Sequence, residues 1–128
     1  MKKIQTLVLS AAFLAASPAF AADAAKEIGV AAAHAGLATQ GKSIEAVHAH
    51  LHHAINCLVG PGGAEFDDEE LNPCTGMGDG AIPDTGDAAK RKLLQSALAK
   101  ANQGLATTDT YAAAKAAAET QALLKTAM

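Results

Sequence analysis

Residues 43–58 read SIEAVHAHLHHAINCL, and this stretch carries the clearest helix and most of the chemically reactive side chains of the 128-residue chain. Ser43 is a good N-cap, and the apolar residues that follow recur three or four positions apart, which predicts an amphipathic helix running to about Leu58. Four of the five histidines lie here, at positions 48, 50, 52 and 53, and Cys57 follows one turn later. The predicted buried seam consists of Ile44, Val47, Leu51, Ala54, Ile55 and Leu58.

A helix places these histidines on two flanks of the seam rather than in one cluster. At about 100° per residue, His48 and His52 fall on one flank, while His50, His53 and Cys57 fall on the other. Two histidines four residues apart on a helix can bind one metal ion, and imidazole nitrogen suits Cu(II), Ni(II) and Zn(II). His48 and His52 have this spacing, and His50 and His53 would form a second, weaker site.

The fifth histidine, His34, precedes the helix and extends the first of these sites. If the chain folds back at the intervening glycine, His34 lies seven residues before the turn and His48 seven residues after it, so the two can face each other. The sequence therefore predicts a metal site of His34, His48 and His52. Two alternatives stay open: the five are boundary histidines of amphipathic helices, or His34 binds non-covalent haem together with His48 or His52. The C-x-x-C-H motif of covalent haem is absent from the sequence, and haem is the less favoured cofactor.

The helix before this stretch begins after Asp23, a good N-cap, and runs to about Ala38. Val30, His34 and Leu37 recur on one of its faces, so His34 is expected on or beside the buried stripe. The turn that follows is short and polar and contains glycine, which is typical of an antiparallel helical hairpin. The first half of the chain therefore predicts one hairpin that carries all five histidines.

A second hairpin is expected in the alanine-rich C-terminal half. One helix starts near residue 85 or 87 and runs to about 103, and the other starts near 108–109 and runs towards 127. With no Trp and one Tyr, the core must consist of Leu, Ile, Val and many Ala, and alanine both favours helices and lets them approach closely. The sequence therefore predicts an all-α fold, a four-helix bundle of two helical hairpins joined by a long loop. The buried residues expected in the second hairpin are Leu94, Ala97, Leu98, Ala101 and Leu105, then Tyr111, Ala114, Ala118, Ala122 and Leu124.

Residues 59–86 form the connection between the hairpins and are rich in Gly, Pro and Asp. In an oxidising compartment Cys57 and Cys74 should pair and pin this loop to the preceding helix, at about 3 kcal/mol in the chain-entropy model. The alternative is that one of the two is a thiolate metal ligand.

Two further candidate ligands lie in this connection. Residues 67–70, all acidic, either start a solvated helical turn or bind Ca²⁺. Met77 either packs against its neighbours or serves as a Cu(I) ligand.

The first residues have the pattern of a secretory signal peptide. Lys2 and Lys3 precede a largely apolar run, Ile4–Ala16, and Pro18 then precedes the small-x-small motif Ala19-Phe20-Ala21 after which a signal peptidase cuts. Such a segment is too short and wrongly flanked for a lasting transmembrane helix. The sequence therefore predicts a signal peptide at 1–21, a single domain at 22–128, and a periplasmic or secreted protein.

Charge and motifs narrow the classes of function. The chain after the predicted signal carries 8 basic and 13 acidic side chains, a net charge of −5, which argues against nucleic acid or an anionic membrane surface as partner. No Ser/His/Asp or paired-carboxylate frame is recognisable, so an enzyme is not expected. Two classes remain: an exported protein that binds divalent transition metal, and a structural or partner-binding module whose disulfide-bound loop 59–86 is the recognition surface.

Residues 30–55, which include the stretch AAAHAGLATQGKSIEAVHAHLHHAI, resemble the small metal-binding proteins of bacterial periplasm, in which alanine-rich helices carry histidines at helical spacing and glycine-containing turns lie between them. The resemblance implies a four-helix bundle that takes up copper, nickel or zinc. This chain has fewer histidines, all in the first hairpin, and adds the loop between Cys57 and Cys74. One or two defined sites are therefore expected rather than high-capacity metal buffering.

Overall fold

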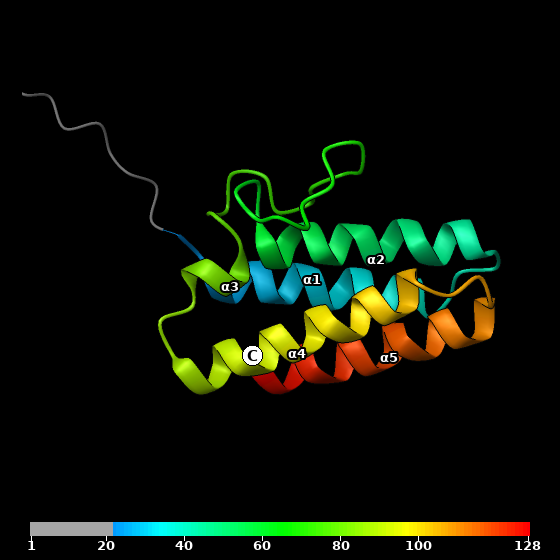
Figure 1. The fold of residues 1–128 in the computed structure, drawn as a ribbon. Helices are drawn as coiled ribbons and strands as arrows, with labels where there is room; N and C mark the ends of the chain where they lie inside the picture. Colours follow the sequence, from blue (N-terminus) through cyan, green and yellow to red (C-terminus); the bar gives the residue numbers. More distant parts are fainter. Residues whose placement is uncertain (1–21) are drawn as a thin grey trace, which may run out of the picture.

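The computed structural model describes residues 22–128, whose four main helices run alternately up and down in one bundle (Figure 1). α1 packs against α2 and α5, and α4 packs against α5 and α2. The predicted all-α bundle of two hairpins with a disulfide in the intervening loop region is confirmed. The predicted signal peptide lies outside the described residues. The helices are α1 (Ala24–Ala38), α2 (Ile44–Val59), the short α3 (Ala81–Asp84), α4 (Ala88–Leu105) and α5 (Thr110–Ala127).

The four main helices begin where short polar side chains cap them. At each start an Asp or Ser oxygen accepts a hydrogen bond from the backbone N–H three residues later, which satisfies one of the amides that a helix N-terminus leaves without a partner. The predicted helix starts are confirmed within three residues, and α3 was not predicted. The capping residues are Asp23, Ser43, Asp87 and Asp109.

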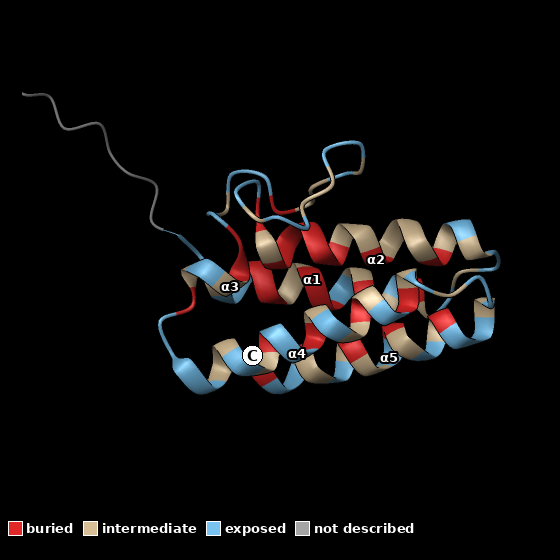
Figure 2. Cartoon of the chain, viewed as in Figure 1, coloured by how far each residue is buried: buried red, intermediate tan, exposed pale blue. Residues whose placement is uncertain are grey.

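Alanine fills much of the space between the helices, and the buried residues follow the inner faces of the bundle (Figure 2). Leu51 and Leu58 of α2 are fully buried, as are Leu94 of α4 and Leu124 of α5. A Cβ placed on Gly104 of α4 would lie 2.6 Å from Leu51 Cδ1. The small residues therefore let α2 and α4 approach closely, as the composition predicts.

The buried faces of α1 and α5 differ from those predicted. Leu37 is 45% exposed and Tyr111 is 80% exposed, and Ala118 and Ala122 also face solvent. Alanine occupies every face of these helices, so the sequence has little hydrophobic contrast with which to fix the rotation of either helix. The residues that α5 does bury are Ala113, Ala117, Thr120, Leu124 and Ala127.

Asn56 organises the long connection. This fully buried side chain accepts a hydrogen bond from the Asp67 backbone N–H at 2.9 Å and donates to the carbonyl oxygens of Asp67 at 2.8 Å and Leu71 at 3.2 Å. Cys57, the next residue, forms the predicted disulfide with Cys74. The segment between the two cysteines is thus fixed to the C-terminal half of α2, where Figure 1 shows it looping above the helix. The acidic residues 67–70 form a hydrogen-bonded turn there rather than a helix.

Two glycines let the end of the connection return to the end of α2. Gly60, with φ 66°, caps α2, and Gly80, with φ 115°, precedes α3. A Cβ on Gly60 would overlap the backbone of Asp79, and a Cβ on Gly80 would lie 2.6 Å from Gly60 N. Close backbone approach and positive φ therefore both require glycine here.

None of the helices in residues 22–128 combines the length and the apolar character needed to span a membrane.

Candidate metal centre

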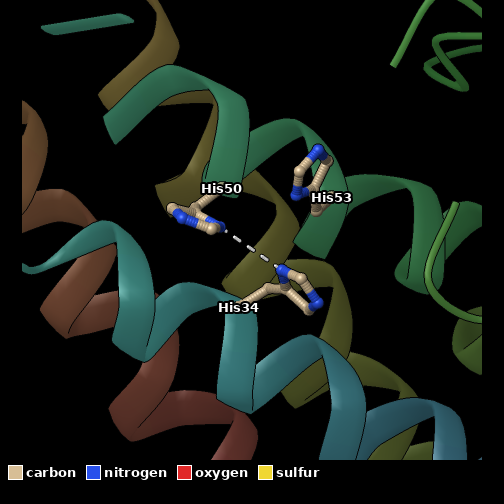
Figure 3. A group of neighbouring side chains, drawn as sticks. All are labelled: His34, His50 and His53. Atoms are coloured by element: carbon tan, nitrogen blue, oxygen red, sulfur yellow. Dashed lines mark hydrogen bonds between the residues drawn. The ribbon is translucent and has the colours of Figure 1, made fainter. Parts of the chain in front are cut away.

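Three histidines from two helices converge on one point of the first hairpin (Figure 3). His34 of α1 lies opposite His50 and His53 of α2, and one ring nitrogen from each lies within 4.8 Å of the other two. The Nδ1 atoms of His34 and His50 are 3.4 Å apart, which is about the separation of two nitrogens that bind one ion at ~2.0–2.1 Å. We call these three residues the histidine triad. It could bind a metal ion.

The helical hairpin explains this grouping. His50 and His53 are three residues apart, so they share the face of α2 that lies over α1. α1 ends at Ala38 and α2 begins at Ile44, and this short turn sets His34 level with the pair. The three imidazole rings are 5.1 to 5.6 Å apart between centroids, and all three residues are partly buried.

The surroundings of His53 orient its ring. Its Nε2 lies 3.5 Å from a carboxylate oxygen of Glu70, in the segment closed by the disulfide. Its Nδ1 is buried and has no hydrogen-bond partner among the described residues. A carboxylate beside one ring nitrogen favours the proton there and leaves the lone pair on the other, an arrangement common around metal-binding histidines. The lone pair of His53 Nδ1 is therefore available to bind an ion.

The electrostatic setting favours the neutral form of His34 and His53. Burial, followed by the neighbouring imidazoles of His53 and His50, lowers the pKa of His34 below its ordinary value. Burial and then His50 lower the pKa of His53, against which Glu70 acts in the opposite direction. Metal ions bind the neutral imidazole, so a lowered pKa reduces competition from protons near pH 7.

These shifts predict how the stability of the metal-free protein depends on pH. The pKa values of His34 and His53 in the folded state lie below 6.5, so near and below that pH the unfolded chain binds more protons than the folded one. Their contribution to stability is therefore present above pH 6.5 and is lost as the pH falls through the lower, folded values. We expect these two histidines to lower the urea midpoint of metal-free protein as the pH falls from about 7.5 to 5.5, relative to a variant that lacks both of them.

A matched variant isolates this effect from other titrating groups. The double substitution His34→Gln with His53→Gln keeps polar side chains of similar size but removes both titrations. Its urea midpoint should fall less over the same pH interval than that of the unsubstituted protein. An equal or larger fall in the variant would contradict the assignment.

His48 has a different role from the one predicted. Its Nε2 lies 3.1 Å from the carbonyl oxygen of Gly104 and 3.0 Å from that of Thr107, at the C-terminal end of α4. Both atoms are acceptors, so the nitrogen carries the proton and donates to them, satisfying carbonyls that a helix end leaves without partners. The predicted grouping of His34 with His48 is corrected. The haem alternative that paired His34 with His48 is not supported either, because His48 faces the end of α4 and not His34.

His52 also lies apart from the triad. Its Nδ1 is 3.3 Å from a carboxylate oxygen of Asp67, and its side chain is 29% exposed.

Sequence reasoning correctly placed His48 and His52 on one flank of α2 and His50 and His53 on the other. The missing information was which flank faces α1. Glu70 was considered only as part of a possible Ca²⁺ site, because its approach to His53 depends on how Asn56 folds the loop.

The other candidate ligands do not assemble with the triad. Cys57 and Cys74 form a disulfide, so neither is available as a thiolate. Within residues 22–128 the triad is the only group of three His, Cys, Asp or Glu side chains close enough to share one ion. The acidic turn at 67–70 contributes carboxylates beside His52 and His53 instead.

Comparisons of the chain with protein-family models, with curated proteins and with solved structures returned no match.

Proposed function

We propose that this protein is exported to the periplasm and binds one divalent transition-metal ion, Cu(II), Ni(II) or Zn(II), through His34, His50 and His53. The observation that carries the proposal is the buried Nδ1 of His53, which has no hydrogen-bond partner among the described residues. A buried polar atom without a partner is costly, at about 1–3 kcal/mol, and a bound ion would supply the missing partner.

The donor set supports the choice of metal. Three imidazole nitrogens suit Zn(II), Cu(II) and Ni(II), whereas Ca²⁺ and Mg²⁺ prefer oxygen ligands. Three protein ligands leave at least one coordination position for water or an exchanging ligand. We propose uptake or delivery of metal rather than catalysis, because the sequence shows no nucleophile or general base in a catalytic frame.

The proposed location rests on two features. The predicted signal peptide at 1–21 directs export, and a disulfide such as Cys57–Cys74 persists in oxidising compartments such as the periplasm. The resemblance of residues 30–55 to small periplasmic metal-binding proteins is consistent with the same location.

Calorimetric titration of purified, metal-stripped protein with Cu(II), Ni(II) and Zn(II) tests the metal proposal. We expect one ion per chain, with a dissociation constant below about 100 μM for at least one of the three. Titration with Ca²⁺ serves as the control and should show no binding to the triad, because imidazole is a poor ligand for that ion. If no transition metal binds below this limit, the proposal is overturned.

A second candidate function is a partner-binding module that uses loop 59–86. The observation that favours it is a hollow of about 570 Å³ between this loop, α3 and α4, lined by Val59, Ile82, Pro83, Arg91 and Leu98 among others. Most of its lining atoms are apolar, which suits a hydrophobic ligand or peptide. A negative metal titration would favour this candidate over the first.

A further inference from the structure

Glu27 is a buried carboxyl group at the start of α1. It is 1% exposed, and its Oε1 accepts a hydrogen bond from the backbone N–H of Gly80 at 3.1 Å. Its Oε2 is buried and has no hydrogen-bond partner among the described residues. A carboxyl group that is nine-tenths buried normally has a positively charged partner or a full set of hydrogen bonds. The Oε2 atom of Glu27 has neither a cation nor a hydrogen-bond donor beside it among the described residues.

The charged groups that act on Glu27 are themselves acidic. Burial first, and then the nearby carboxylates of Asp84 and Asp79, raise the pKa of Glu27 to about 7, against the effect of the Gly80 hydrogen bond. Lys26 is the adjacent residue on α1, but its side chain faces solvent. Among residues 22–128, no Lys, Arg or His side chain forms an ion pair with Glu27 or Asp84, so no cation there matches these two close carboxyl groups.

The chain segment just before α1 lies beside these carboxyl groups. The backbone N–H of Asp23 donates to the carbonyl oxygen of Met77 at 2.9 Å, which fixes the start of the described chain against the loop. A Cβ placed on Gly78 would collide with Asp84 Oδ2 and would lie 3.0 Å from Glu27 Oε1 and 3.3 Å from the Cβ of Ala22. Ala22, Glu27 and Asp84 therefore meet around one glycine, and Figure 1 shows the chain entering α1 beside α3.

We propose that removal of the signal peptide creates the missing cation, so that the new α-ammonium group of Ala22 forms an ion pair with the carboxyl groups of Glu27 and Asp84. Water hydrolyses the Ala21–Ala22 peptide bond, the carboxylate stays on Ala21 and leaves with the signal, and the amine stays on Ala22. This amine has an ordinary pKa of about 7.7–8.0, so it is mostly protonated at neutral pH. In the precursor the same nitrogen is an uncharged amide and cannot form the pair.

The pair would tie the maturation of the protein to the stability of one end of the bundle. Without the cation, the pKa of Glu27 is raised from 4.5 to about 7, so its contribution to stability is present below pH 4.5 and lost as the pH rises through 7. With the cation, Glu27 can ionise without that loss. The ion pair would then join the start of α1 to residues 77–84, which include α3. The proposal rests on the export part of the proposed function, because it requires cleavage of the signal peptide, and it does not require metal binding, since Glu27 is not part of the triad.

A comparison of two N-termini tests this proposal. Mature protein is purified after export, its start at Ala22 is checked by mass spectrometry, and half of it is acetylated at the α-amine. We expect carboxyl ¹³C NMR titration to give Glu27 a pKa at least about one unit lower in the free-amine form, since an opposite charge within ~4–6 Å lowers a carboxyl pKa by that much. The free-amine form should also melt several degrees higher at pH 7.

The variant Glu27→Gln provides the matched control. It is isosteric and can still accept the hydrogen bond of Gly80, so the bundle should fold. In this variant the melting temperatures of the free and acetylated forms should agree within about 1 °C. The proposal is overturned if the pKa of Glu27 is the same in both forms, if the Gln variant keeps the full difference in melting temperature, or if the mature chain begins at another residue.

Discussion

Replacement of His53 by alanine is expected to weaken the binding of the preferred metal ion by at least about 100-fold. Loss of an outer-shell partner alone costs 10–100-fold in metal affinity, and His53→Ala removes a ligand atom itself. His53 also has the one ring nitrogen of the triad that is buried without a hydrogen-bond partner among the described residues. Competition against a chromophoric chelator measures the change, which corresponds to about 2.8 kcal/mol at 1.4 kcal/mol per tenfold.

The double variant His48→Ala with His52→Ala is the matched control. It removes two imidazoles from α2, where His53→Ala removes one, but it leaves the triad intact, so its metal affinity should stay within about twofold of the unsubstituted protein. Its melting temperature should fall, because the carbonyl groups of Gly104 and Thr107 lose their donor. If this variant loses the metal while His53→Ala retains it, the ion binds on the other flank of α2 and the triad is not the site.

The fold could be predicted from the sequence because its decisive signals are local. Asp23, Ser43, Asp87 and Asp109 each cap a helix through contacts within three residues, and Gly60 ends α2 through its own backbone conformation. The pairing of Cys57 with Cys74 was expected because the predicted signal peptide directs the chain to an oxidising compartment. None of these features depends on how the helices rotate against each other.

The site could be predicted only in part because it depends on that rotation. On α2, the strong contrast between apolar seam and histidine flanks fixed the two pairs of histidines correctly. On α1, His34 is surrounded by alanine and glycine, so the pattern did not show which flank of α2 it would meet. The same weak contrast explains why Leu37 and Tyr111, predicted to be buried, are exposed. The burial of Glu27 and the approach of Glu70 to His53 could not be predicted, since each depends on how a loop segment folds back onto a helix.

Removal of the disulfide is expected to reduce both stability and metal affinity. The substitutions Cys57→Ala and Cys74→Ala should lower the free energy of unfolding of metal-free protein by about 3 kcal/mol, measured by urea denaturation, because the unfolded chain regains the freedom that the closed loop removed. Glu70 lies inside this loop, and its carboxylate approaches His53 Nε2. We therefore also expect metal affinity to fall by about tenfold, the smaller end of the range for an outer-shell partner.

The decrease in affinity stays moderate because the loop has a second attachment. Asn56 holds the backbone of Asp67 and Leu71 independently of the sulfur atoms, so Glu70 remains near His53 for part of the time. The variant Glu70→Gln, with the disulfide intact, separates the two effects: it should lose about the same metal affinity but little of the free energy of unfolding, since the side chain of Glu70 is 36% exposed. Unchanged metal affinity in both variants would show that the loop stabilises the bundle without tuning the site. Equal losses of affinity, with a stability loss only in the cysteine variant, would show that the disulfide acts on the triad through Glu70.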